Sequence, residues 1–140
     1  MDLKIQYNCN NINWDLVSEI LKKGEMAYFS GEVHKKAFEN SHTVVFVFHE
    51  DKLIGFGRAI SDGVYQAVIY DVAVLPEYHG KGIGKEIVNN IIKCIPTCNF
   101  ILYASPGKEA FYEKLNFKKM KTAMGLFINA EKVRDKGITE

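Results

Sequence analysis

Residues 76–85, Pro-Glu-Tyr-His-Gly-Lys-Gly-Ile-Gly-Lys, carry glycine at three alternate positions, 80, 82 and 84. An apolar run at residues 68–75 precedes this stretch, and residues 83–92 repeat apolar side chains at helical spacing. A strand, a glycine turn and a helix in this order point free backbone N–H groups at an anion. Glycine also lets the backbone approach a ligand and take positive φ. The stretch predicts a pyrophosphate-binding loop; the alternative is a glycine turn that merely joins a strand to a helix.

Two other phosphate-binding glycine motifs do not fit this stretch. A P-loop requires Gly-x-x-x-x-Gly-Lys followed by Ser or Thr. Here His79 stands where the first glycine would be, and Glu86 follows Lys85. The dinucleotide fingerprint requires Gly-x-Gly-x-x-Gly, whereas the spacing here is Gly-x-Gly-x-Gly. The sequence therefore disfavours a nucleotide-binding protein of either kind.

The same residues resemble the acetyl-CoA motif of the GNAT superfamily of N-acetyltransferases. That motif reads Arg/Gln-x-x-Gly-x-Gly/Ala, and its backbone amides hold the pyrophosphate of coenzyme A. The resemblance implies that acetyl-CoA is bound by the backbone of the loop, with the lysines beside it. Histidine replaces the usual Arg or Gln at the first position. The cofactor-binding residues implied are His79, Gly80, Lys81, Gly82, Ile83, Gly84 and Lys85.

A second stretch, Phe111-Tyr112-Glu113-Lys114-Leu115-Asn116-Phe117, resembles the family motif Phe-Tyr-x-x-x-Gly-Phe. In the family this tyrosine lies near the sulfur of coenzyme A. The resemblance implies that Tyr112 donates a proton to the departing thiolate and that Phe111 contacts the coenzyme. Lys114 is a candidate for contact with the coenzyme phosphates, and the alternative is that it lies on a solvated helix face. Simple core packing of the tyrosine is the alternative. Asn116 replaces glycine, and Asn is the second choice for the left-handed position that ends a helix.

Asp71 lies in an apolar strand sequence, Ile-Tyr-Asp-Val-Ala-Val, that leads into the glycine loop. Burying a carboxylate is costly, so this position is a candidate general base for an amine substrate. The alternatives are that Asp71 faces solvent or pairs with Arg58. Similar proteins bind the thioester carbonyl with backbone N–H groups at this place. The resemblance therefore implies roles for Val72, Ala73 and Val74, provided that the two central strands separate there.

Bulk properties restrict the class of protein. The chain has 140 residues, 47% of them apolar, and a formal net charge of +1. This size predicts one domain over residues 1–140, and this charge gives no reason to expect nucleic acid or an acidic membrane as partner. There is no apolar run of about 18 residues and no signal-peptide pattern. Three cysteines, Cys9, Cys94 and Cys98, favour reduced thiols in a cytoplasm and give no zinc site.

Periodicity predicts a mixed α/β fold with the order βααβββαβαββ, a central mixed sheet flanked by helices. This order matches the GNAT fold. Residues 131–140 are charged and predict a loose tail. The expected strands cover residues 3–7, 43–48, 53–60, 64–75, 100–104, 117–120 and 123–128, and the expected helices cover residues 14–24, 31–40, 83–92 and 106–115.

The function implied is acetyl transfer from acetyl-CoA to a primary amine of a small molecule or peptide, without a metal. The alternative is a coenzyme A-binding sensor without turnover. Residues 53–63 and 70–74 further resemble small bacterial and plant arylalkylamine-type acetyltransferases, which implies a small-molecule or protein amine without selecting one. Loop placement alone suggests a pocket for an aromatic amine, lined by Tyr28, Phe29, Asp62 and Tyr65. Similar proteins are often dimers, so a homodimer is open.

Overall fold

The computed structural model describes all 140 residues. They form two compact units, Met1–Leu102 and Tyr103–Glu140. The first unit contains the whole sheet and the glycine loop, and the second contains Tyr112. That the two units make up a single domain stays a prediction.

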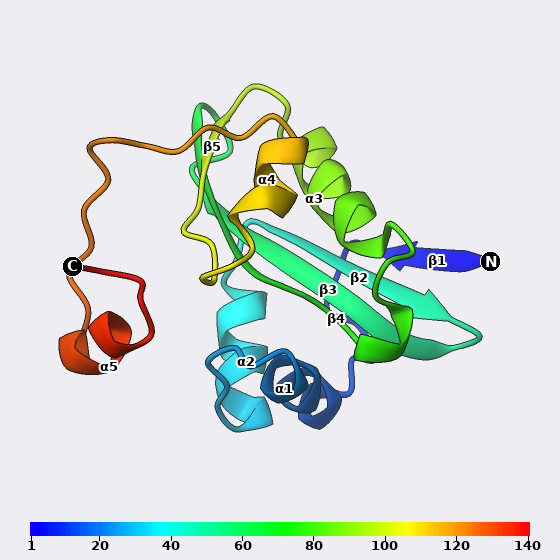
Figure 1. The fold of residues 1–140 in the computed structure, drawn as a ribbon. Coiled ribbons are helices and arrows are strands. Elements are labelled where there is room, and N and C mark those ends of the chain that lie inside the picture. Colours follow the sequence, from blue (N-terminus) through cyan, green and yellow to red (C-terminus); the bar gives the residue numbers. More distant parts are fainter. The chain divides into compact units, whose positions relative to one another are not determined.

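Five strands form one mixed sheet in chain order, β1-β2-β3-β4-β5. The first four pair antiparallel, and β4 pairs parallel with β5 (Figure 1). The parallel pair follows from the crossover helix between these strands, as the sequence predicts. The tight turn between β2 and β3 places Glu50 at φ 50° and Asp51 at φ 63°. The strands are β1 Leu3–Gln6, β2 Thr43–His49, β3 Lys52–Ser61, β4 Gln66–Val74 and β5 Asn99–Ile101.

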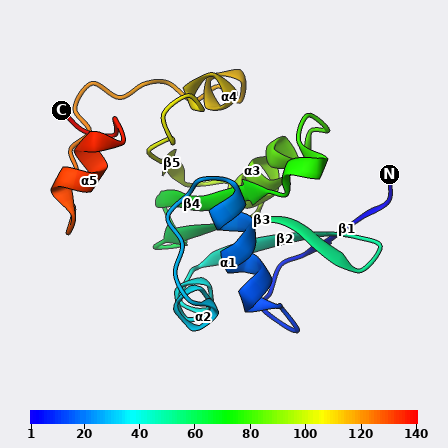
Figure 2. The same ribbon diagram turned by 60° about the horizontal axis from the view of Figure 1, so that its bottom comes forward.

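Helices cover both faces of this sheet. The helices α1, Trp14–Lys23, and α2, Gly31–Glu39, lie on one face, and α3, Ile83–Cys94, lies on the other (Figure 2). Asn13 caps α1, because its side-chain oxygen accepts the Leu16 N–H at 3.2 Å. The glycine at position 24 ends this helix, as predicted.

An aromatic cluster fills the space between α1, α2 and the sheet. Trp14, Phe38, Phe46 and Phe56 contact one another with ring centroids 5.5–6.3 Å apart. The last three are fully buried. Aromatic side chains bury large apolar areas, so this cluster fixes α2 against β2 and β3.

On the opposite face, α3 packs closely over two glycines of β3. A Cβ atom at Gly57 would lie 2.8 Å from Ile87 and 3.2 Å from Ile91, and one at Gly55 would lie 3.2 Å from Ile87. The absence of side chains at these two positions leaves room on this face of β3. The structure uses the room for a helix, so these glycines set how closely α3, and with it the glycine loop, lies on the sheet.

The second unit differs from its predicted structure. The helix expected at residues 106–115 is shorter, α4 Glu109–Lys114, because Gly107 takes φ 93° and a helix cannot pass through that conformation. The strands expected at 117–120 and 123–128 do not form. The charged tail contains a short helix, α5 Ala130–Asp135. No helix anywhere in the chain has the length and apolar character needed to cross a bilayer.

Strand propensity alone does not account for residues 117–128. The side chains of Met124, Leu126 and Ile128 alternate along the chain and are almost fully exposed, at 98%, 103% and 109%. A strand is stabilised by cross-strand partners, and β-propensity reflects the fit to a sheet surface more than a backbone preference. The alternating pattern is present, but the second unit contains no strand that could pair with it.

Candidate active site

The glycine loop connects the end of β4 to the start of α3. A 3₁₀ turn, η1 Pro76–Tyr78, follows the strand, and α3 begins at Ile83. Gly80 and Gly82 have φ values of 77° and 79°. A Cβ atom at either position would meet no heavy atom within 4 Å. Backbone conformation therefore requires glycine here, since the left-handed region costs other residues about 1–2 kcal/mol.

The N-terminus of α3 faces this loop without a side-chain cap. Gly82 is the N-cap residue, and the bond from the Glu86 N–H to its carbonyl, 3.1 Å long, is the first of the helix. The N–H groups of Ile83, Gly84 and Lys85 therefore precede any intrahelical partner. Ile83 is buried and anchors the helix start on the sheet, while Lys81 and Lys85 are exposed. This arrangement suits an anion.

His79 ties the loop to the end of β4. Its Nε2 lies 2.7 Å from the carbonyl oxygen of Val74. A carbonyl only accepts, so Nε2 carries the proton and donates it. The ring is exposed. At the position where the family motif has Arg or Gln, this chain therefore has a histidine whose side chain is hydrogen-bonded to the Val74 carbonyl.

A bulge interrupts β4 just before the loop. Tyr70 lies opposite Arg58 and Ala73 lies opposite Phe56, so β4 has one residue more than β3 between these pairs. Asp71 is at the bulge with φ 57°. Positive φ is tolerated by Asp better than by most residues. A bulge bends its strand and redirects the residues that follow it, and bulges recur beside active sites.

The bulge turns the amide of Val74 toward the open edge of β4. The Leu75 N–H donates to Ile54 of β3 at 2.8 Å. Polar groups alternate along a strand, so Ala73 also bonds toward β3 and Val74 faces the other edge. Pairing of β4 with β5 ends at Val68, which leaves that edge open near the loop. The expected separation of the two strands is present, but the Ala73 amide does not point into it.

Asp71 pairs with Arg58. The Arg58 Nε donates to Asp71 Oδ2 at 2.7 Å, and the two side chains are 15% and 22% exposed. The sequence left open whether Asp71 faces solvent or pairs with Arg58, and in the structure it pairs with Arg58. One carboxylate oxygen is occupied by the guanidinium, and the acid lies within three residues of the open edge at Val74.

His34 is a residue that sequence reasoning left without a role. It is buried on α2, and its Nε2 accepts the Phe29 N–H at 2.9 Å. Burial lowers the pKa of its imidazole, with the Asp71 carboxylate opposing and the Arg58 guanidinium adding to the shift. The i, i+4 spacing of His34 and Phe38 was the available signal. Val33, the apolar residue next to it on α2, is instead 48% exposed.

Phe29 is held by a second hydrogen bond, from the Ser18 hydroxyl to its carbonyl. The α1–α2 connection thus presents the exposed rings of Tyr28 and Phe29 from an anchored backbone. Asp62, which the sequence suggested as a residue of the acceptor pocket, instead hydrogen-bonds to the turn that follows it. Its Oδ1 accepts the N–H groups of residues 64, 65 and 66, which lower the pKa of its carboxyl.

In the second unit, Tyr112 packs between two aromatic rings. Its centroid lies 4.9 Å from that of Phe111 and 5.7 Å from that of Phe117. Burial raises the pKa of its phenol, which keeps the hydroxyl protonated. Asn116 takes φ 72°, and the Phe117 N–H bonds to the Tyr112 carbonyl at 3.1 Å. The predicted left-handed end of this helix is confirmed; Lys114 is exposed.

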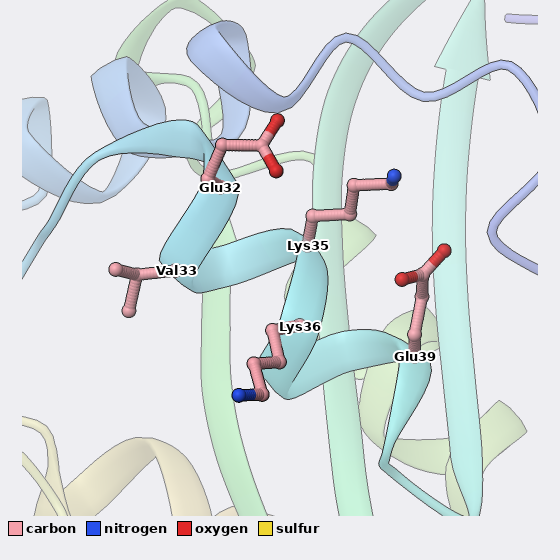
Figure 3. A pocket seen from close by; sticks show the side chains of 5 residues that line it. All are labelled: Glu32, Val33, Lys35, Lys36 and Glu39. Carbon is pink, nitrogen blue, oxygen red and sulfur yellow. The ribbon is translucent and has the colours of Figure 1, made fainter.

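The surface of α2 carries a hollow lined by Glu32, Val33, Lys35, Lys36 and Glu39. All five come from one helix and point outward around it (Figure 3). A second hollow lies between the starts of α1 and α2, with Asp15 and Glu32 among its lining residues. Neither includes the glycine loop or Tyr112, so neither is the site predicted from sequence.

Comparison with known proteins decides the family. A family model described as acetyltransferase (GNAT) domain matches residues 40–119, which include β2, β3, β4, the glycine loop and Tyr112. The chain belongs to the GNAT acetyltransferase family. The matched region contains both stretches on which the resemblance rested.

Relatives of this GNAT domain are described as N-acetyltransferases. An uncharacterized N-acetyltransferase (ycf52-like) from Prochlorococcus marinus is 40% identical over 86 residues, covering 56% of this chain and 48% of the relative. An uncharacterized N-acetyltransferase (ycf52) from Pyropia yezoensis is 29% identical over 123 residues, covering 83% and 64%. The chain thus spans about half to two thirds of the length of these relatives.

A solved structure from methicillin-resistant Staphylococcus aureus, described as a protein of unknown function and probable acetyltransferase, superposes with a TM-score of 0.78. It is 26% identical and covers 91% of this chain and 98% of its own. The likeness confirms the GNAT fold predicted from the order of elements.

Proposed function

We propose that this GNAT domain transfers an acetyl group from acetyl-CoA to a primary amine. The observation that carries the proposal is the loop at residues 79–85, where two left-handed glycines and an uncapped helix start direct backbone N–H groups outward. Such an arrangement favours the pyrophosphate of coenzyme A. Gly80, Gly82 and the amides of Ile83, Gly84 and Lys85 would hold the phosphates, with the two lysines adding charge.

The thioester carbonyl would be bound at the open edge of β4. The Val74 amide faces that edge, and a fixed N–H donor near a developing oxyanion stabilises it in the transition state. The amine nitrogen attacks the carbonyl carbon, the C–S bond breaks and the thiolate leaves. Tyr112, protonated because burial raises the pKa of its phenol, would supply the proton that the sulfur takes up.

The amine must lose a proton to react. An alkylamine with a pKa near 10.4 is neutral to only about 1 part in 10³ at pH 7. Asp71 is the proposed base, directly or through water. Its pairing with Arg58 supports a fixed carboxylate beside the open edge. The acceptor class includes small aromatic amines, because exposed Tyr28 and Phe29 stand on an anchored backbone.

The experiment is a turnover assay with acetyl-CoA and a panel of amines. The panel holds arylalkylamines, aliphatic amines and peptides with free N-termini or lysines, and free thiol and acetylated product are both measured. We expect Tyr112→Phe to lower kcat about 10²-fold, in the range for loss of a general acid, without weakening coenzyme A binding. Tyr7→Phe, which removes the hydroxyl that bonds Asn90, is the control and should behave as wild type.

The competing function is a coenzyme A-binding sensor. It would be favoured by tight coenzyme A binding with no acetylated product from any amine of the panel. Asp71→Asn separates the base from a purely structural carboxylate. Asparagine keeps the shape and tolerates positive φ, so unchanged kcat in this variant would remove Asp71 from the proposed chemistry.

A further inference from the structure

Arg58 contacts three elements that meet at the β4 bulge. Besides the bond from its Nε to Asp71, its Nη1 donates to the Ser41 hydroxyl at 3.3 Å. Its guanidinium carbon lies 5.5 Å from the ring centre of Phe38 and 5.3 Å from that of Tyr70. The cation is therefore held by α2, by Ser41 in the turn between α2 and β2, and by β4.

This set of contacts depends on the shape of the arginine side chain. The guanidinium is planar, can donate in two directions at once and stacks on aromatic faces, whereas a lysine ammonium is a compact charge on a flexible stem. Ser41 is itself fixed, because its hydroxyl donates to the Ala37 carbonyl at 2.8 Å. Contacts other than the one with Asp71 therefore hold the guanidinium in place.

The bulge decides which way the Val74 amide points. Without the extra residue, regular alternation from Tyr70 would direct Val72 and Val74 toward β3. With it, Ala73 and Leu75 bond to β3 and Val74 faces the open edge. The bulged residue is Asp71, in a conformation that side chains rarely adopt. Its carboxylate accepts the hydrogen bond from Arg58.

We infer that Arg58 is a positioning residue, which locks the β4 bulge through Asp71 and so aims the Val74 amide at the open edge. The inference rests on the proposed function for its catalytic consequence, but its structural part is independent of turnover. Arg58 would not contact the reacting atoms. It would hold both the Asp71 carboxylate and the Val74 amide in their orientations.

The test compares Arg58→Lys and Arg58→Gln with Lys23→Gln. The control breaks the exposed pair between Lys23 and Glu19 on α1. Amide hydrogen exchange is measured for Ala73 and Leu75 and, as an internal reference, for Ile87 and Ile91 of α3. We expect exchange at Ala73 and Leu75 to be at least tenfold faster in both Arg58 variants, with the α3 amides unchanged. The control should match wild type throughout.

Turnover gives the second readout. We expect kcat with a reacting amine to fall at least tenfold in Arg58→Lys, while melting temperature stays within a few degrees. Wild-type protection at Ala73 and Leu75 in both Arg58 variants would overturn the inference. Faster exchange there with wild-type kcat would overturn its catalytic part. If wild type itself acetylates nothing, the proposed function fails, and the exchange data still decide whether Arg58 holds the bulge.

Discussion

Gly82 is the residue on which the loop geometry depends most directly. Its φ of 79° costs an alanine about 1–2 kcal/mol. We expect Gly82→Ala to lower the melting temperature by several degrees and to raise the KM for acetyl-CoA. Gly137→Ala is the matched control, since position 137 also takes positive φ, 81°, and lies outside the loop. Equal KM values in the two variants would argue against the loop as the phosphate site.

His34 predicts a pH dependence of stability. Burial lowers its pKa in the folded state, so the unfolded chain binds the proton first as pH falls. The free energy of unfolding should therefore decrease below about pH 6.5, by up to about 1.4 kcal/mol per pH unit, until the folded imidazole is protonated.

Denaturant unfolding of wild type and His34→Gln from pH 7.5 to 5 checks this dependence. Glutamine can still accept the Phe29 N–H but does not titrate. A wild-type slope that persists unchanged in His34→Gln would assign the pH dependence to other groups.

At the residue scale, the sequence indicated Asp71, Tyr112 and the glycines but not their partners. The Asp71–Arg58 pair was one of several alternatives, because register across a bulge cannot be read from a pattern of period two. His34 was missed because its partner is a backbone N–H in a loop. Such bonds depend on where the chain returns in space.

At the scale of elements, His79 links η1 and the glycine loop to β4. Removing its 2.7 Å hydrogen bond to the Val74 carbonyl should destabilise the ordered conformation of the loop by about 0.5–1.5 kcal/mol. We expect His79→Leu to raise the KM for acetyl-CoA about three- to tenfold and His79→Gln, whose amide can still donate, to raise it less. Steady-state kinetics of the two variants measures this. A larger effect of Gln than of Leu would contradict the role given to this bond.

Periodicity predicted the strands and helices of the first unit, but it did not predict the secondary structure of the second unit correctly. The stripes of α1 and α3 face a sheet that buries them, so pattern and packing agree. Residues 123–128 have the alternation of a strand, yet the second unit contains no other strand with which they could pair. A pattern predicts an element only where the fold supplies its partner.

At the scale of the whole molecule, the order of elements and the two motifs were sufficient to indicate the GNAT family, and the family model confirms it. The acceptor amine was not predictable in the same way. In the proposed function, coenzyme A would be recognised by backbone amides at fixed glycines, and such glycines leave a sequence signature. The proposed acceptor contacts are side chains from separate loops, such as Tyr28 and Phe29 between α1 and α2, and no spacing rule connects such residues.

Calorimetric titration measures whether the glycine loop binds coenzyme A, on which the proposed function depends. Acetyl-CoA, coenzyme A, ATP and NAD are titrated separately into wild type and Gly82→Ala. We predict binding of acetyl-CoA and coenzyme A to wild type, with at least tenfold weaker affinity in Gly82→Ala, and no comparable binding of ATP or NAD. Absence of coenzyme A binding by wild type, or stronger binding of ATP, would contradict the account.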